Sequence, residues 1–405
     1  MELKLKKEAL QYYEVAEVPA FSFETTQETI VPDYCPDVAR VVDTDGIVLI
    51  QSREIGMEGR MEIGGAVKAT VLFVPDGTGG AAVLHLTMPF RTYCDGKELE
   101  GCTHCALQAS LKSLDARLLN PRKLLLRADI SLSPAGYAPQ TTTLCTGLEE
   151  GEGIQVLEEE GTCALLTEVI QRDMDFTEEL QVPASRKGIR ELLTSQVEVT
   201  PTELKILGHK LVVKGVVTAE VLYRSQADEL CTLDQEYAFS QVLETSADEE
   251  QGEARASFEL RDCEFQVGSE QRMDDEYTVT LHLQMRTVAE VYERRNVRHL
   301  ADLYGLTGTV KLESQPVRLS EDLVSYTRKY NAREIVETGV AVKQVICAHV
   351  RCGAAACRRE GDAASVQAPA LLRVLYCDEN GSLLSAERDV ILSADMELEG
   401  DAVAR

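Results

Sequence analysis

The sequence predicts a mainly β protein, made of tandem β-rich modules of sandwich or barrel-like form, each with a short helix. Two observations lead to this prediction. One segment recurs three times at intervals of about one domain length, and each copy alternates apolar and polar residues as a strand does. The chain has 405 residues, which is enough for two or three domains with cores of their own.

The repeat is clearest where the triplets that begin at Val71, Val221 and Val374 are matched, 150 and 153 residues apart. The surrounding segments are GAVKATVLFVPDG from Gly65, GVVTAEVLYRSQAD from Gly215 and APALLRVLYCDENG from Ala368. Turn residues follow, as Asp76-Gly77 in the first copy and Asn380-Gly381 in the third, and a second extended run comes next. Each copy therefore predicts a β-hairpin with one face on a core.

Upstream of each hairpin, three apolar residues recur at a spacing that predicts one face of a short helix. They are Val38, Val41 and Val42, then Ile189, Leu192 and Leu193, then Ala332, Ile335 and Val336. Downstream, alternation predicts two more strands in the second copy, around 254–260 and 277–285, with weaker equivalents around 107–111 and 124–132 in the first. Each unit should thus hold four to six mostly antiparallel strands.

The predicted modules are residues 21–146 for repeat 1, 162–312 for repeat 2 and 316–405 for repeat 3. The third copy stops soon after its hairpin and is expected to be incomplete: either the sequence is a piece of a longer chain, or this copy is completed by something else. If Arg405 is the natural terminus, the copy is expected to leave a strand edge open for pairing with another chain. The acidic runs at 147–161 and 247–253 are expected to be solvated connections.

Composition excludes several classes of function. Asp plus Glu number 68 against 41 Lys plus Arg, and a net charge of −27 disfavours nucleic acid as a partner. No stretch approaches the roughly 18 apolar residues of a membrane span, and the first residues lack the apolar core of a secretion signal, which predicts a cytoplasmic protein without membrane insertion. Trp is absent, which weighs against sugar-stacking sites.

The cysteines offer two groupings that could carry chemistry. Cys102-Thr103-His104-Cys105 could bind zinc or cycle as a redox pair, although a structural zinc site needs about four ligands and no second CxxC exists. Cys347, His349, Cys352 and Cys357 supply four ligand types, but strand alternation would send Cys347 and Cys352 to opposite faces. Packing is the favoured interpretation of both groups, and we assign no metal, cofactor or catalytic residue.

Two further motifs have ordinary structural interpretations. The glycine-rich run from Asp76 to Gly80 joins two predicted strands, which is typical of a hairpin and not of a phosphate-binding loop. The six histidines show no HExxH spacing. The basic stretch YERRNVRHLADLY, from Tyr292 to Tyr304, could dock an acidic partner; the alternative is an inter-repeat helix whose arginines pair with nearby carboxylates.

The arrangement resembles the SPOCS-domain family of spore-forming bacteria, in which such repeats precede a C-terminal LysM module. The resemblance rests on CPDVARVVDTDGIVLIQSREI from Cys35, the recurring VLF and VLY strands, and RKGIRELL from Arg186. No LysM-like segment follows the third repeat in this chain, so peptidoglycan binding is not carried over. The resemblance implies a mother-cell scaffold at the forming spore surface that binds the coat-basement ATPase or another coat morphogenetic protein.

The leading hypothesis is therefore a non-enzymatic scaffold of spore coat or spore envelope assembly, with self-association a further expectation. Tandem modules raise the effective local concentration of weak contacts, which suits assembly. Two alternatives stay open: a hydrolase or metal-dependent enzyme with a site assembled in space, and an array of carbohydrate-binding modules at an envelope surface. A deep pocket with convergent polar groups in one repeat would favour the enzyme.

Overall fold

The computed structural model describes residues 4–56, 58–77, 80–149, 153–183, 188–268, 277–306, 308, 310–311, 313–320, 330–360 and 363–397. Nearly all of these residues lie in antiparallel strands, which confirms the mainly β prediction. The described part of the chain holds no α-helix, and its one helical turn is the 3-10 turn η1 (Lys97–Leu99). The predicted short helix of each module is therefore wrong.

Repeat 1 is a sandwich of two sheets. The hairpin sheet has the order β3-β4-β5, and the second sheet has β7 at its centre, paired with β2, β6 and, further along, β1. The apolar faces of the two sheets share one buried cluster that includes Val67, Phe73, Leu126 and Ile130. The strands are β1 (Leu5–Glu17), β2 (Phe21–Ile30), β3 (Val38–Ile55), β4 (Arg60–Pro75), β5 (Ala82–Asp95), β6 (His104–Asn120) and β7 (Lys123–Leu148).

Repeat 2 has the same plan, with a hairpin sheet β9-β10-β11 packed on a second sheet β12-β13-β8. Both strands predicted after its hairpin are present. The matching strands β6 and β7 confirm the weaker prediction in repeat 1. The strands of repeat 2 are β8 (Ile154–Gln181), β9 (Ile189–Leu207), β10 (Lys210–Ser225), β11 (Leu230–Glu244), β12 (Gly252–Val267) and β13 (Thr278–Gly305).

Repeat 3 consists of one sheet, in which β16 pairs with β14, β15 and β17. The described residues contain no second sheet that belongs to it. The proposed boundary residues 146 and 162 lie inside β7 and β8, and where independently folding units begin and end stays a prediction. The strands are β14 (Val342–Cys352), β15 (Ala356–Glu360), β16 (Ala363–Asp378) and β17 (Leu383–Glu397).

The spacing that predicted a helix is produced by a pair of β-bulges at the start of each hairpin sheet. In β3 the register against β4 shifts between Val38 and Arg40 and again between Val41 and Asp43. The same two shifts occur in β9 against β10 and in β14 against β16. Each bulge adds one residue to a period of two, so apolar side chains recur at a helix-like interval.

The bulges also correct the alignment of the third copy. The residues that match Val38, Val41 and Val42 are Val342, Val345 and Ile346, not the predicted residues at 332, 335 and 336. Residues 332–336 lie in a segment without regular secondary structure.

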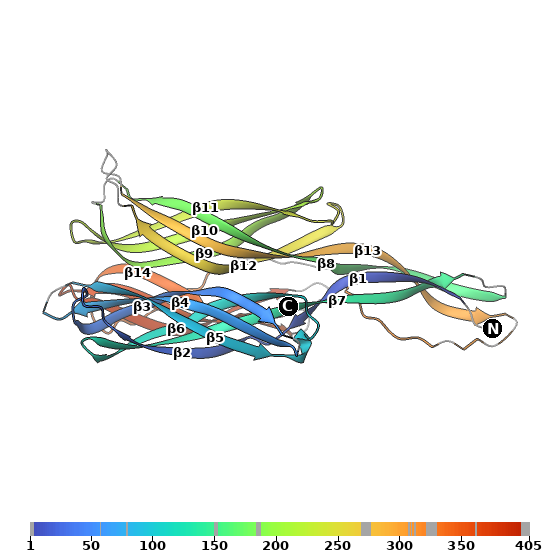
Figure 1. The fold of residues 1–405 in the computed structure, drawn as a ribbon, viewed down its shortest axis with the longest axis horizontal. Helices are drawn as coiled ribbons and strands as arrows, with labels where there is room; N and C mark the ends of the chain where they lie inside the picture. Colours follow the sequence, from blue (N-terminus) through green and yellow to red (C-terminus); the bar gives the residue numbers. More distant parts are fainter. Residues whose placement is uncertain are drawn as a thin grey trace.

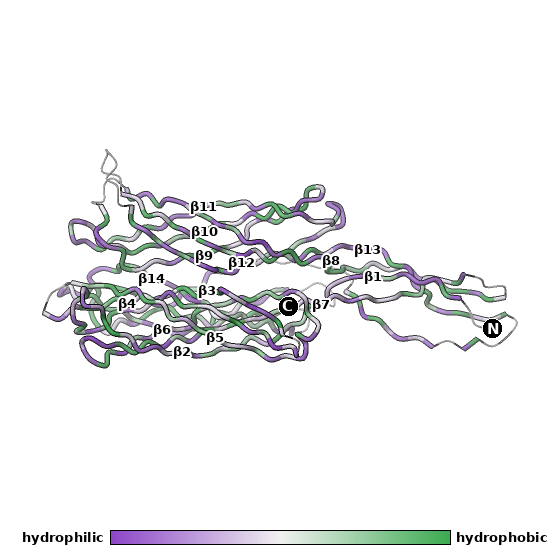
Figure 2. The backbone as a smooth tube through the Cα atoms, viewed as in Figure 1, coloured by the Kyte–Doolittle hydropathy of each residue, from purple (hydrophilic) through white to green (hydrophobic). Residues whose placement is uncertain are grey.

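Strands β1, β7, β8 and β13 run beyond the two sandwiches and form an arm (Figure 1). The outer half of β7 pairs with β1, and the outer half of β8 pairs with β13, so the arm consists of two antiparallel ribbons. Leu10, Cys163 and Leu165 form a small buried cluster between the ribbons. Hydrophobic and hydrophilic residues alternate along these strands, as Figure 2 shows. Residues 154–161, expected to be a solvated connection, are instead the first part of strand β8.

Candidate functional site

The three hairpin sheets meet at a shared apolar cluster, which we call the axial cluster. It contains three sets of equivalent positions, and each repeat contributes one residue to each set. The first set is the second bulge residue of the first hairpin-sheet strand, and the second set is the residue that faces it on the central strand. The third set lies where the last strand of the hairpin sheet begins. The repeats therefore present the same positions to one common centre. The three sets are Val42, Leu193 and Ile346; Leu72, Leu222 and Leu375; and Ala81, Leu230 and Leu383.

Polar contacts around the axial cluster link the repeats in a closed ring. Arg224 of repeat 2 donates to the carbonyl oxygen of Ala81 in repeat 1. His349 Nδ1 of repeat 3 lies 3.2 Å from Glu220 Oε2 of repeat 2. Ser385 Oγ of repeat 3 donates to the carbonyl oxygen of Val42 in repeat 1 at 2.6 Å. Each repeat thus contacts both of the others.

The junction of repeats 1 and 3 buries Asp43, Asp45 and Arg373 and partly buries Arg351. Arg373 Nη1 lies 3.2 Å from Asp43 Oδ1, and Arg373 also pairs with Glu387 and donates to the carbonyl oxygen of Thr44. Arg351 pairs with Asp45, which is 5% exposed. Separating repeat 3 from repeat 1 would leave buried charges without partners, which costs free energy. These pairs therefore stabilise the contact between the two repeats.

The environment of these groups shifts their proton affinities. Burial raises the pKa of Asp43, and the positive charge of Arg373 only partly opposes that shift. Burial, and after it the nearby positive charge of Arg373, lower the pKa of Arg351 to about 10. Both shifts reflect the cost of removing a charge from water. The geometry places these arginine and aspartate side chains for ion pairing with one another.

Repeats 1 and 2 are joined by a second buried ion pair. Arg53 Nε lies 2.9 Å from Glu259 Oε1, with 3% of each side chain exposed. The same oxygen accepts a hydrogen bond from the backbone N–H of Leu107 at 2.8 Å. Burial raises the pKa of Glu259, while Arg53 opposes the shift. A partly exposed pair, Lys68 with Asp262 at 2.6 Å, supports the same junction.

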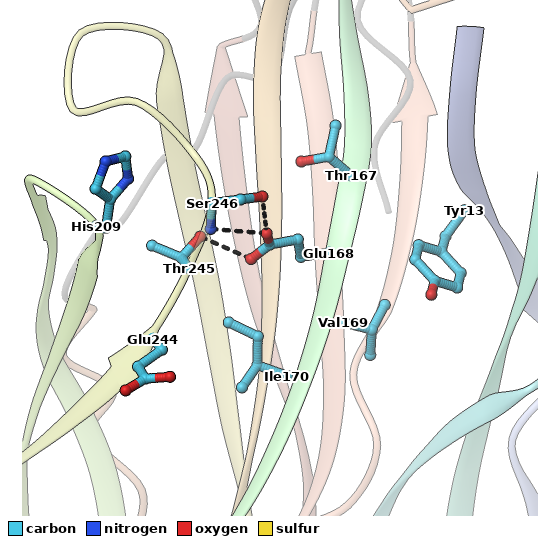
Figure 3. Close-up of a pocket in the computed structure, with 9 residues that line it drawn as sticks. All are labelled: Tyr13, Thr167, Glu168, Val169, Ile170, His209, Glu244, Thr245 and Ser246. Atoms are coloured by element: carbon cyan, nitrogen blue, oxygen red, sulfur yellow. Dashed lines mark hydrogen bonds between the residues drawn. The ribbon is translucent and has the colours of Figure 1, made fainter.

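A shallow hollow lies beside strand β8, where Figure 3 shows Glu168 between the strands and the turn after β11. Glu168 accepts hydrogen bonds from Thr245 Oγ1 at 2.7 Å and from the backbone N–H of Ser246 at 2.8 Å. Burial alone would raise the pKa of Glu168, but these hydrogen bonds lower it. The carboxylate therefore anchors the turn, and no hydrogen bond joins it to His209 in Figure 3.

The first cysteine group lies where η1 leads into β6. Burial raises the pKa of Cys102 and of Cys105, and it does the same for Cys94 nearby. All three are free thiols whose reactive thiolate form is disfavoured. Within the described ranges, no three His, Cys, Asp or Glu side chains come together in a way that could hold a metal ion.

The second cysteine group is divided between two faces of repeat 3. Cys347 packs against the axial cluster, and burial raises its pKa to about 12. Cys352 and Cys357 are exposed on the other face. His349 belongs to the ring contact with Glu220.

The remaining motifs also occupy structural positions. The loop that begins at Asp76 joins β4 to β5 as a hairpin, with Thr78 and Gly79 outside the described residues. The stretch from Tyr292 to Tyr304 lies in strand β13, so the helix expected there is wrong. Its arginines do pair with carboxylates, as Arg298 does with Glu160 at 2.6 Å.

Sequence reasoning did not identify the buried charges of the junction. Asp43 and Asp45 lie in the DTDGIVLI stretch, and Arg373 interrupts an apolar strand. Charged residues at positions that alternate with a buried face are a usable signal. Charged residues at alternate positions are common on solvated strands, however. The burial of Asp43, Asp45 and Arg373 becomes clear only when the third repeat is seen packed against the first.

Among the described residues, repeat 3 leaves part of one sheet face open, which we call the uncovered face, although Ala370 and Tyr376 on the same face are 4% and 2% exposed. In repeats 1 and 2 the equivalent face packs on the second sheet. In repeat 3, Val345 is 55% exposed and Val350 is 57% exposed, and Leu372 and Val374 are only half-buried. The charged groups of the junction pair with one another, although Arg351 Nη1 and Arg373 Nε are buried without a hydrogen-bond partner among the described residues.

Comparison with known proteins finds one segment that is similar to a known family. Residues 188–268 match the family model described as SipL, SPOCS domain, and they span β9 to β12. No curated protein and no solved structure matches the chain. None of the described helical residues forms a helix long and apolar enough to cross a membrane. The match confirms, for this segment, the resemblance seen in the sequence: residues 188–268 of the second repeat are similar to the SPOCS domain.

Proposed function

We propose that the chain is a non-enzymatic scaffold of spore coat or spore envelope assembly. The SPOCS-family match supports a role in sporulation. The observation that carries the scaffold role is the use of charged groups: the buried Arg, Asp and Glu side chains of the junctions bind one another and hold three repeats in a ring. Such an arrangement provides rigid surfaces at fixed separations, which suits assembly.

The proposed location is the mother-cell cytoplasm, at the surface of the forming spore. The proposed partner is the coat-basement ATPase or another coat morphogenetic protein, as the family resemblance implies. A fluorescent fusion expressed in a spore-forming bacterium should form a ring around the forming spore. Fluorescence spread evenly through the mother cell would contradict the proposal.

Binding is tested with purified components. The full chain should retain the coat-basement ATPase in a pull-down, while an unrelated acidic β protein of similar net charge should not. The comparison at 50 and 200 mM salt separates general charge attraction from specific contact, because exposed charges are screened at higher ionic strength. If the ATPase binds the control equally well, or binds neither protein, the proposed partner is wrong.

A further inference from the structure

Two cysteines of repeat 1 lie on the same side of a glycine. Cys105 in β6 is directly opposite Gly136 in β7, and opposed residues of an antiparallel pair point their side chains to the same face of the sheet. A Cβ placed on Gly136 would lie 2.7 Å from Cys102 Sγ. The sulfur of Cys102 therefore occupies the space that a side chain at position 136 would fill, next to Cys105.

The register limits the separation of the two cysteines. Opposed Cβ positions of an antiparallel pair lie about 4.5–5.5 Å apart, so Cys102 Sγ is at most about 8 Å from Cys105 Cβ. Gly136 has no side chain to stand between them. The backbone between the cysteines is held in place, because the N–H of Thr103 donates to the carbonyl oxygen of Tyr137 at 2.9 Å. The fold therefore keeps the two thiols near each other.

The two thiols differ in their exposure to solvent. Cys102 is half-buried, whereas Cys105 is 7% exposed and belongs to the core of repeat 1. Burial raises the pKa of Cys102, and the negative charge of an ionised Cys105 raises it further, which agrees with the short separation. A small oxidant can therefore reach the outer thiol, and the inner thiol is placed to react with the product.

We propose that Cys102 and Cys105 are a thiol pair that peroxides convert into a disulfide. In the first step Cys102 loses its thiol proton and its sulfur takes an OH group from hydrogen peroxide, so that the O–O bond breaks, a sulfenic acid forms and one water leaves. In the second step Cys105 loses its thiol proton and its sulfur displaces that OH group as a second water, which forms the S–S bond. Two thiols are oxidised, and one hydrogen peroxide is reduced to two waters.

The pair lies where the arm joins repeat 1. The ring of His104, between the two cysteines, packs edge-on against Tyr13 of β1, with the ring centroids 5.6 Å apart. Gln171 of β8 donates to the carbonyl oxygen of Cys105 at 2.8 Å. Both β1 and β8 continue into the arm, so the disulfide would form at this joint. The proposal adds a modification site to the chain and does not depend on the scaffold role.

The test follows the two thiols in the full chain by mass spectrometry. The reduced chain is treated with a small molar excess of hydrogen peroxide, unfolded, blocked with iodoacetamide and cut with trypsin. Cleavage after Lys97 and Lys112 gives one peptide, 98–112, that holds both cysteines and no others. This peptide should lack both blocking groups and be two hydrogen masses lighter than the reduced peptide. Blocking groups on both cysteines, or a bond from either of them to Cys94, would overturn the proposal.

Cys145→Ser is the matched control for Cys102→Ser. Both cysteines are half-buried and each Sγ lies 3.7 Å from a backbone carbonyl oxygen, but Cys145 lies in β7 opposite Lys7. The control should form the disulfide at the wild-type rate, whereas Cys105 should stay a blockable thiol in Cys102→Ser. Because only the thiolate attacks, the wild type should react about tenfold faster at pH 8 than at pH 7. Equal loss of the Cys105 thiol in both variants, or a rate independent of pH, would contradict the assigned roles.

Discussion

At the scale of single residues, the buried charges of the ring make the clearest prediction. Arg373→Met removes the partner of Asp43, which is 8% exposed, and should lower the free energy of unfolding by about 3–5 kcal/mol. Asp43→Leu in the same chain should recover part of this loss, because no unpaired aspartate remains. Urea unfolding followed by circular dichroism measures both.

The matched control for that experiment is Arg298→Met, which breaks the exposed pair with Glu160 on the arm. It should change the urea midpoint little, because exposed pairs are screened by water and salt. Equal effects of the two arginine substitutions would show that the junction is not desolvated in solution.

Glu168 makes a prediction about pH. Its hydrogen bonds from Thr245 and Ser246 lower its pKa in the folded chain, so its contribution to stability is full above the unfolded value of about 4.3 and is lost as the pH falls through the folded pKa. Glu168→Gln should cost about 1–2 kcal/mol at pH 7. The difference from wild type should shrink as the pH falls below about 4.3 and vanish once the pH is below the folded pKa, and thermal unfolding at several pH values tests this.

At the scale of elements, each of the first two repeats pairs a glycine with a phenylalanine across the hairpin. Gly65 lies opposite Phe90 and Gly215 lies opposite Phe239, and a Cβ on either glycine would clash with the facing ring. Repeat 3 instead has Ala368 opposite Leu392. The two kinds of pair are alternative ways of filling the same position in the sheet.

Gly215→Ala should therefore destabilise repeat 2 by about 1–3 kcal/mol. Adding Phe239→Leu, which copies the pair of repeat 3, should recover part of the loss; the rest reflects the approach of the new Cβ to within 2.9 Å of the carbonyl oxygen of Thr200. Gly161→Ala is the control, since no atom lies within 4 Å of its Cβ position. If Phe239→Leu worsens the loss, the ring is not the source of the clash.

The strands also show which elements can be predicted from sequence patterns. Alternation predicts the hairpins and the strands β12 and β13, because each buries one face. The double bulge is misread as a helix, since an extra residue in a strand and a turn of helix produce the same apolar spacing. The spacing of Val38, Val41 and Val42 is the same in a helical turn and in a doubly bulged strand. Only the pairing with the neighbouring strand distinguishes the two.

At the scale of the whole molecule, sequence finds the three repeats but not their arrangement. The contacts that close the ring join residues far apart in sequence, and equivalent residues such as Val42, Leu193 and Ile346 look like ordinary core positions within each copy. The incompleteness of repeat 3 was expected to expose a strand edge. The structure shows that outer strands also end the hairpin sheets of repeats 1 and 2, whereas the uncovered face is particular to repeat 3.

The ring predicts an unusual result in limited proteolysis. A protease that cuts after glutamate should cut first at Glu313, in a segment without regular secondary structure, and later at Glu158 to Glu160, which lie in paired strand β8. The two pieces should stay together in gel filtration, because the ion pairs of Arg351 and Arg373 cross the cut. Earlier cleavage at Glu158 to Glu160, or separation of the pieces without denaturant, would contradict this arrangement.

Closure of the ring has a consequence for synthesis of the protein. The hydrogen bond from Ser385 to Val42 spans 343 positions in sequence, so its two ends leave the ribosome far apart in time. At 5–20 residues per second the delay is roughly 20–70 s. During that interval Asp43 and Asp45 cannot pair with the arginines of repeat 3. The side of the axial cluster that repeat 3 later covers is exposed to water. The ring therefore closes only after repeat 3 has been synthesised, and the arrival of that sheet sets the speed of this step.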